Sequence, residues 1–436
     1  MPNLNPNSTN YVHTHEPHTN DLVQAMTYDP YGAPVLRIDD TTKQHTSKNR
    51  VKVSTYEVTD FATFTTGKDE DIWDELTTGT ASATHDPYLG MIKLEVGSDV
   101  GDKVVRQTKR VQRYIPGRQG EVALTFIFET PVVGVRRRFG MFDELNGFFF
   151  EDSGDGTYRC VLRRNVSLGV VDEESFARDE WNVDKLDGTG PSGIVADPTA
   201  IQHMSIEYEW YGAGMVEWNF IIDNNKYPIH RIYHGNTHPH TWASKAALPI
   251  RIELENFGGA AGTHALYQGS HSVSVEGSTE LLGRQKSVSS AITGKDLDGA
   301  NTFIPVVAIR LKSNALDSVV IPDEFSAATL DNTSIFVRAI EDATITGGTW
   351  VSFSDDSAIE YNITATGFTN GTVLSTIFVN PNNQGNTYKF PERSVTQIQR
   401  NTTTTLGDTS GTFLIALAST LANKDGFASL GWIEVR

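Results

Sequence analysis

The stretch that decides the fold begins at Gln112, ends at Cys160 and reads QRYIPGRQGEVALTFIFETPVVGVRRRFGMFDELNGFFFEDSGDGTYRC. Its first apolar run has one large side chain at every second position: Val122, Leu124, Phe126 and Phe128. That spacing places the four side chains on one face of a β-strand. Similar alternation fills residues 133–142, and a dense apolar run follows at residues 148–150. Gly, Asp and Ser residues separate the runs, so the stretch predicts short strands joined by tight turns.

The same pattern continues beyond this stretch, in the region between residues 202 and 254. Its alternating positions fall into four groups: Gln202, Met204, Ile206, Tyr208 and Trp210; Val216, Trp218, Phe220 and Ile222; Tyr227, Ile229, Arg231 and Tyr233; and Ile250, Ile252 and Leu254. Antiparallel strands with one wet face give this pattern. Many such strands in series favour two stacked sheets, and the series also resembles a concanavalin-type jelly roll. We therefore expect a concanavalin-like, jelly-roll-like β-sandwich.

The length of 436 residues exceeds what one ordinary core accommodates. We expect an extended anchoring arm over residues 1–50, a jelly-roll-like sandwich over 51–276, a linker over 277–300 and a smaller β-sandwich over 301–436. The strands expected in the last part cover residues 303–312, 318–322, 334–340, 350–353, 372–379, 412–418 and 430–435. The predicted fold class is therefore all-β throughout.

Composition excludes several functions. The net charge of −18 argues against a protein that coats nucleic acid or docks on an anionic membrane. No apolar run approaches the 18 residues of a membrane-spanning helix, and the N-terminus does not read as a signal peptide. The single cysteine, Cys160, rules out an intrachain disulfide and is expected to be a small core residue. Such cysteine usage fits assembly in a reducing cytoplasm.

One segment has the opposite charge. Residues 103–138 contain nine basic and two acidic residues. Such a stripe can pair with an acidic surface of another subunit, with acids of its own chain, or with a polyanion. We expect subunit contacts, and the candidate residues are Arg106, Lys109, Arg110, Arg113, Arg136, Arg137 and Arg138.

Two pairs of glutamates raise the question of a glycosidase: Glu207 with Glu209, and Glu253 with Glu255. Residues i and i+2 share a strand face about 7 Å apart, and glycosidases need two carboxyl groups about 5–10 Å apart. The chain lacks the compact E-x-D-x-x-E or E-x-D-x-E strand of lectin-like glycosidases, so solvated strand faces are the simpler interpretation. We accordingly expect no catalytic residues and no enzymatic activity.

Histidines gather twice, at His13, His15 and His18 and again at His230, His234, His238 and His240. A transition-metal site needs imidazoles in a fixed geometry, and neither a cysteine pair nor HExxH spacing supports one here. The run Asp152–Gly156 resembles part of a calcium loop but lacks its remaining oxygen ligands, so a hairpin turn is expected. We predict neither a metal site nor a cofactor.

Several segments between residues 105 and 257 resemble virion structural proteins of tailed bacteriophages, especially those of marine and cyanobacterial viruses. The matching segments are QRYIPGRQGEVALTFIFETP, GVRRRFGMFDELNGFFFE, WNVDKLDGTGPSGI, YEWYGAGMVEWNFIID and HGNTHPHTW followed by LPIRIELEN. Three later segments are similar to a C-terminal β module of the same proteins: VVAIRLKSNALDSVVIPDEF, TGGTWVSF and LGWIEV. The N-terminal arm is not matched.

The resemblance implies a structural component of the tail, neck, baseplate or fibre, assembled in the host cytoplasm and located in the virion. Its expected partners are copies of itself and other virion proteins. The alternative is a lectin-like receptor-binding protein that recognises host surface glycans through aromatic residues such as Trp210, Tyr211 or Trp242. A polysaccharide depolymerase and a capsid decoration protein are further alternatives. The residues that would bind a ligand stay unknown at this point.

Overall fold

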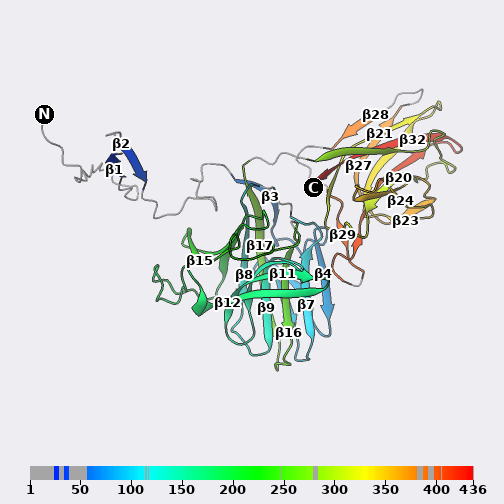
Figure 1. Ribbon diagram of the computed structural model, residues 1–436. Helices are drawn as coiled ribbons and strands as arrows, with labels where there is room; N and C mark the ends of the chain where they lie inside the picture. Colours follow the sequence, from blue (N-terminus) through cyan, green and yellow to red (C-terminus); the bar gives the residue numbers. More distant parts are fainter. Residues whose placement is uncertain are drawn as a thin grey trace, which may run out of the picture. The chain divides into compact units, whose positions relative to one another are not determined.

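The computed structural model (Figure 1) describes residues 24–28, 34–38, 56–112, 115, 117–245, 247–277, 283–380, 386–390, 397–403 and 405–435. Residues Thr55–Arg436 form one compact unit. The expected anchoring arm over residues 1–50 lies outside the described residues, except for the antiparallel pair of β1 (Gln24–Tyr28) and β2 (Pro34–Ile38).

The first sandwich contains a seven-stranded antiparallel sheet with the order β12-β11-β10-β9-β16-β7-β4. Its strands are β4 (Trp73–Thr78), β7 (Asp102–Thr108), β9 (Val135–Phe142), β10 (Gly147–Asp152), β11 (Tyr158–Ser167), β12 (Val170–Ala177) and β16 (Ile250–Asn256). A single-turn helix, η1 (Arg178–Glu180), follows β12. The late strand β16 pairs with both β9 and β7, so segments far apart in the chain form adjacent strands.

The opposing sheet has eight strands in the order β15-β14-β13-β8-β17-β6-β5, with β3 added alongside β17. Its strands are β3 (Tyr56–Ala62), β5 (Ser82–Asp86), β6 (Met91–Val96), β8 (Gly120–Phe128), β13 (Gln202–Tyr208), β14 (Met215–Ile222), β15 (Asn225–Tyr233) and β17 (His264–Glu276). Strands far apart in the chain are also adjacent here, because β17 lies between β8 and β6. This arrangement is the expected concanavalin-like jelly roll.

The core between the two sheets is aromatic. The ring centre of Phe150 lies 6.0 Å from that of Phe139 on its own sheet, and 6.1 Å and 5.7 Å from those of Phe126 and Phe220 on the opposing sheet. The four alternating residues from Val122 to Phe128 are all buried, as their spacing predicts. Cys160 is a buried free cysteine in this core, and burial raises the pKa of its thiol. The residues 152–156 form the hairpin between β10 and β11, as expected.

One expected face is wrong. The pattern predicts that Ile229, Arg231 and Tyr233 share a face of β15. A β-bulge shifts the register, so that Trp218 faces His230 while the next residue, Asn219, faces Pro228. Proline cannot donate to the ladder and is found at such irregularities. His230 therefore turns inward and lies against Phe176 at 4.3 Å, whereas Tyr233 is exposed.

The second sandwich packs a five-stranded sheet, with the path β18-β32-β21-β28 and β19 beside β32, on a six-stranded sheet with the order β24-β25-β20-β31-β22-β27. The bounds of the first sheet are β18 (Arg284–Ser289), β19 (Lys295–Asp296), β21 (Val319–Thr329), β28 (Asn386–Lys389) and β32 (Asp425–Val435). Those of the second are β20 (Ile304–Leu311), β22 (Ile335–Glu341), β24 (Val351–Ser352), β25 (Ile359–Asn362), β27 (Thr372–Val379) and β31 (Thr412–Ser419). Two small pairs complete it: β23 (Thr344–Thr346) with β26 (Gly367–Thr369), and β29 (Arg400–Asn401) with β30 (Thr409–Ser410).

The segment 277–300, expected as a linker, contributes to this second sandwich. Within it, β18 pairs with β32 over six residues, and β19 pairs with the same strand further along. The sheet therefore begins before residue 301. Among the described residues, no helix has the length and apolarity needed to cross a bilayer.

Candidate functional site

Charged side chains occupy the face of the seven-stranded sheet that points away from the core. Register explains their order, because Glu253 of β16 lies directly opposite Arg138 of β9, and Arg138 lies opposite Glu151 of β10. Glu253 is 2% exposed and lies 2.9 Å from both Lys103 Nζ and Arg251 Nη2. These residues lie on four neighbouring strands of one sheet, β10, β9, β16 and β7. We call the five of them the charged face: Lys103, Arg138, Glu151, Arg251 and Glu253.

Glu253 is the centre of the charged face. Burial alone would raise the pKa of this carboxyl group, but the positive charges of Arg251, Lys103 and Arg138 outweigh that effect and lower it. Glu253 therefore stays ionised at neutral pH. A carboxylate held in this way cannot act as the general acid that a glycosidase requires.

Aromatic rings lie beneath the arginines of this face. Phe142, Phe149 and Val161 form a small buried apolar cluster on the same side of the sheet. The guanidinium of Arg163 lies 4.9 Å from the ring centre of Phe149, and that of Arg251 lies 5.4 Å from Phe142. Cation–π contacts and carboxylates together replace the water that these arginines lose.

The described arginines of the basic stripe are used inside the chain. Arg106 is 1% exposed and contacts Gln268, while burial lowers its pKa to about 10. Arg137 is completely buried and lies 2.6 Å from Asp152. The prediction of subunit contacts is therefore wrong for Arg106, Arg137 and Arg138, because all three are buried and pair with groups of their own chain.

The remaining candidates for subunit contacts divide into three cases. Arg136 pairs with Glu255 at 2.6 Å and keeps 29% of its side chain exposed. Lys109 and Arg110 are half-buried, and their charges act on Glu341 and Asp342 of the second sandwich. Arg113 lies outside the described residues.

The second glutamate pair is also held by polar contacts. Glu207 on β13 is 3% exposed and lies 2.6 Å from Lys226 Nζ, and Gln119 donates a hydrogen bond to it. Burial would lower the pKa of Lys226, but Glu207 and Glu121 raise it. Glu209 is buried on the same face. The interpretation of both pairs as solvated strand faces is wrong, because three of the four carboxylates are buried.

The aromatic candidates for sugar stacking separate clearly. Trp242 is 2% exposed and therefore offers no ring face to a ligand, and Trp210 is partly buried against the core. Tyr211, in contrast, is 52% exposed in the turn between β13 and β14. The bulge in β15 exposes a second ring, Tyr233, at the same end of the sandwich.

Three of the four later histidines converge after β15, whereas His13, His15 and His18 lie outside the described residues. The rings of His234 and His238 are stacked at 4.3 Å, and His240 lies 5.2 Å from His234. Glu174 of β12 joins this group, although nothing in the spacing of the sequence connects it with residues sixty positions later. Only its alternation with Asp172 and Phe176 could have placed it on the inner side of its strand.

No protein-family model matches the chain, and no curated protein matches its sequence. Solved structures match in their fold over about half of the chain. An endo-1,3-beta-glucanase from Streptomyces sioyaensis has a TM-score of 0.36 at 10% identity and covers 51% of this chain and 97% of its own. The Crh5 transglycosylase in complex with NAG has a TM-score of 0.33 at 14% identity, covering 50% and 84%. A legume lectin-like domain from Entamoeba histolytica has a TM-score of 0.32 at 12% identity, covering 50% and 98%.

These comparisons correct one expectation. The sequence led us to expect no enzymatic activity, yet glycoside hydrolases and a transglycosylase predominate among the solved structures that the chain resembles. We therefore withdraw that expectation. At these identities the likeness concerns the fold and assigns no reaction to this chain.

Proposed function

We propose that the protein is a structural component of a tailed-bacteriophage virion, in the tail, neck, baseplate or fibre, that assembles with copies of itself and with other virion proteins. The resemblance of the segments between residues 105 and 257 to phage virion proteins is the reason for assigning the protein to a phage particle. The observation that supports assembly is the edge strand β27 of the second sandwich.

Strand β27 reads TVLSTIFV and has no charged residue and no proline. Within the described part of the chain, no strand continues the sheet beyond it. Val373, Leu374 and Phe378 are 46%, 39% and 61% exposed on this edge. Monomeric proteins protect such edges with charges, prolines or bulges, because an open apolar edge pairs with other strands. Of these three, β27 has a bulge, at Leu374, which lies between the pair of Val373 with Ile340 and the pair of Ser375 with Ala339. An uncharged edge also suits two copies of a chain whose net charge of −18 makes other surfaces repel.

We expect the wild-type protein to form a symmetric oligomer through β27, and Leu374→Lys/Phe378→Lys to dissociate it into monomers. Two like charges would meet across a two-fold strand pair and lose hydration. Light scattering coupled to size-exclusion chromatography measures the mass of both proteins. The matched control is Ile292→Lys/Leu330→Lys, which adds the same charge at exposed apolar positions of other turns in the same sandwich.

A wild-type protein that stays monomeric at all concentrations and does not bind phage particles would contradict this proposal. A control variant that dissociates as readily as the β27 variant would place the contact elsewhere. Locating the protein in a reconstructed virion would test directly whether it is a component of the particle.

A second candidate function is binding of host surface glycans, and the two exposed tyrosines favour it. The turn that carries Tyr211 is joined to the segment after β15, since Gly235 N donates to Ala213 O at 3.1 Å. Tyr211 and Tyr233 thus present rings at one end of the sandwich, and exposed aromatic rings stack on the apolar faces of sugars. We expect Tyr211→Ala and Tyr233→Ala each to weaken binding on a glycan array at least about tenfold, the equivalent of about 1.4 kcal/mol.

The control for that experiment is Tyr88→Ala, because Tyr88 is 98% exposed in the turn between β5 and β6. If this variant loses as much binding as the other two, the array reports nonspecific adhesion. If the wild type binds no glycan and does not adsorb to host cells, the candidate function is removed.

A further inference from the structure

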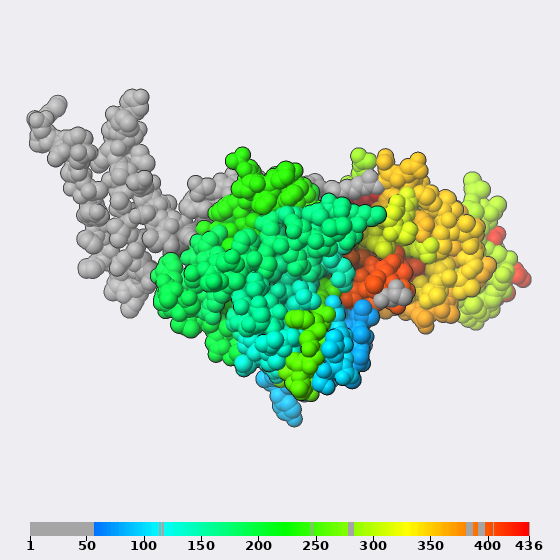
Figure 2. All heavy atoms as spheres, turned by 60° about the horizontal axis from the view of Figure 1, so that its bottom comes forward, coloured from blue at the N-terminus to red at the C-terminus, as the bar shows by residue number. Residues whose placement is uncertain are grey.

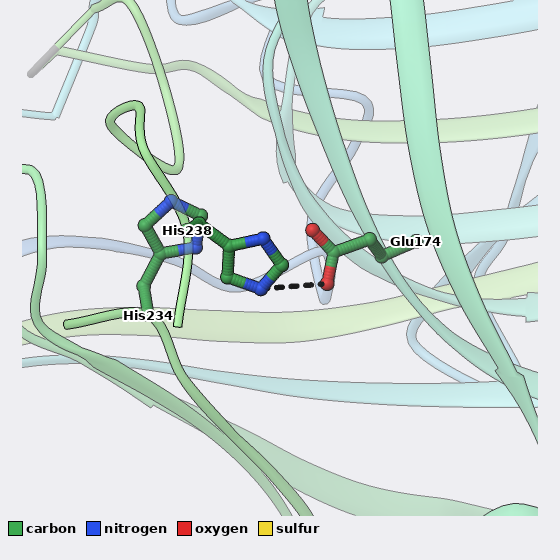
Figure 3. Close-up of side chains that lie close together, drawn as sticks. All are labelled: Glu174, His234 and His238. Atoms are coloured by element: carbon green, nitrogen blue, oxygen red, sulfur yellow. Dashed lines mark ion pairs between the residues drawn. The ribbon is translucent and has the colours of Figure 1, made fainter. Parts of the chain in front are cut away.

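Three side chains with metal-ligating atoms meet where the open edges of the two sheets of the first sandwich approach each other (Figure 3). Glu174 lies on β12, the last strand of the seven-stranded sheet, and His234 and His238 follow β15, the last strand of the opposing sheet. One ligand atom from each residue lies within 4.8 Å of the other two. We propose that Glu174, His234 and His238 bind a divalent transition-metal ion, with zinc as the preferred ion.

His234 is already prepared as a ligand. His234 is 1% exposed, and its Nε2 lies 2.5 Å from the carbonyl oxygen of His240. Because a carbonyl oxygen only accepts, Nε2 carries the proton and Nδ1 carries the lone pair. This Nδ1 is buried without a hydrogen-bond partner among the described residues. In Figure 3 it faces His238 and Glu174.

A carbonyl that fixes the far nitrogen of a histidine is the usual support of a metal-bound imidazole. A buried acceptor without a partner costs free energy, and a bound cation would remove that cost. The contact between His234 and His240 therefore orients His234 as a metal ligand, a role that packing in the core would not require.

Glu174 is oriented from the other side. One of its oxygens accepts a hydrogen bond from Arg164, and the other, Oε2, lies 3.7 Å from His238 Nε2. Arg164 also pairs with Asp172, so two carboxylates share one guanidinium and the group keeps an excess negative charge. That excess favours a cation at the free oxygen of Glu174.

One of the distances already suits a small ion, and all three ligand atoms lie within 4.8 Å of one another. Ligand atoms around tetrahedral zinc lie about 3.3–3.6 Å apart, given bonds of about 2.0–2.2 Å. The 3.7 Å between His238 Nε2 and Glu174 Oε2 is close to this value. The side chain of His238 is 29% exposed in a loop, so a rotation of its ring can complete the set. Two imidazoles and one carboxylate select zinc or a neighbouring transition metal over calcium and magnesium, which prefer oxygen ligands.

The location gives the ion a definite effect. It would connect an edge strand of one sheet to the loop that leaves the edge strand of the other. Ions that bind only the folded protein stabilise it by mass action. We therefore expect zinc to raise the unfolding midpoint, and a chelator to reverse the increase.

The test is isothermal titration of the full chain with zinc chloride, together with Co²⁺ absorption spectra. We expect one high-affinity site with a tetrahedral Co²⁺ spectrum in His13→Ala/His15→Ala/His18→Ala, which removes the N-terminal histidines as competing ligands. In that background, His238→Ala and Glu174→Gln should each lower affinity by more than the roughly 10–100-fold that loss of a supporting residue costs. The matched control is His203→Ala, at an exposed histidine on β13, which should bind normally.

Two results would overturn the proposal. The first is a triple variant that binds no zinc, which would identify the group as an ion pair between His238 and Glu174. The second is an unchanged affinity in His238→Ala, because His238 lies in a loop with 29% of its side chain exposed and its loss should leave folding intact. If Glu174→Gln unfolds because Arg164 loses a partner, His238→Ala alone decides the question.

Discussion

Glu253→Gln is expected to destabilise the protein by about 3–5 kcal/mol, the loss typical of breaking one side of a buried ion pair. Glutamine keeps the shape of glutamate and removes its charge. Arg251, Lys103 and Arg138 would then repel one another on the charged face without the carboxylate that separates them. Arg251 is 1% exposed, so water cannot replace the lost partner.

The measurement is the midpoint and slope of urea unfolding for the wild type and the variant. Glu95→Gln is the matched control, because it breaks the ion pair of Lys93 with Glu95, at 2.6 Å, where the two side chains keep 31% and 27% exposure. Exposed pairs contribute about 0.2–1 kcal/mol, so this control should lose at most that amount. Equal losses in the two variants would show that burial does not set the strength of the charged face.

The charged face also shows what the sequence predicts and where prediction ends. Alternation identified Phe126 and Phe128 as core residues because burial on one face follows directly from a period of two. The same alternation could not reveal that Arg138 has Glu253 as its neighbour. Pairing of β9 with β16 depends on the order of strands in the finished sheet, and more than a hundred residues separate the partners.

The histidine group illustrates the same limit. Its residues are visible in the sequence as HRIYHGNTHPH, yet a metal site was not predicted, because the third ligand comes from an edge strand of the other sheet. The bulge next to Pro228 determines which way the histidine side chains point. The bulge shifts the register of β15 by one residue, so that His230 points into the core. His234, four residues later, then lies at the open edge of the sheet. Strict periodicity cannot anticipate a bulge, although proline is a signal for one.

The second large effect concerns pH, and it centres on Glu341 at the end of β22. This residue is 8% exposed, and its Oε1 has no hydrogen-bond partner among the described residues. Burial raises the pKa of Glu341 to about 7, and the charge of Asp342 adds to the effect, while Arg110 and Lys109 oppose it. Two residues of the basic stripe therefore act here on an acidic pair of their own chain.

The direction in which stability changes with pH follows from the protonation of Glu341 in the folded and in the unfolded protein. Below pH 4.5, the ordinary value for a glutamate, the side chain is protonated both in the folded and in the unfolded protein. Between pH 4.5 and about 7 the unfolded chain ionises while the folded one stays neutral, so stability falls as the pH rises. Above that range the loss is complete, on the order of 3 kcal/mol for a shift of about 2.5 pH units.

Glu341→Gln should remove this loss. We expect the variant to match the wild type near pH 4.5 and to exceed its unfolding free energy at pH 8 by on the order of 3 kcal/mol. Urea unfolding at both pH values measures the difference. Asp342→Asn provides a second lever, since removing the neighbouring charge should lower the pKa of Glu341 and reduce the pH dependence without abolishing it. A Gln variant that is less stable than the wild type at pH 8 would mean that the ionised carboxylate of Glu341 stabilises the folded protein. Lys109 and Arg110 would then hold a true ion pair with it, and burial would not be the dominant influence on this carboxyl group.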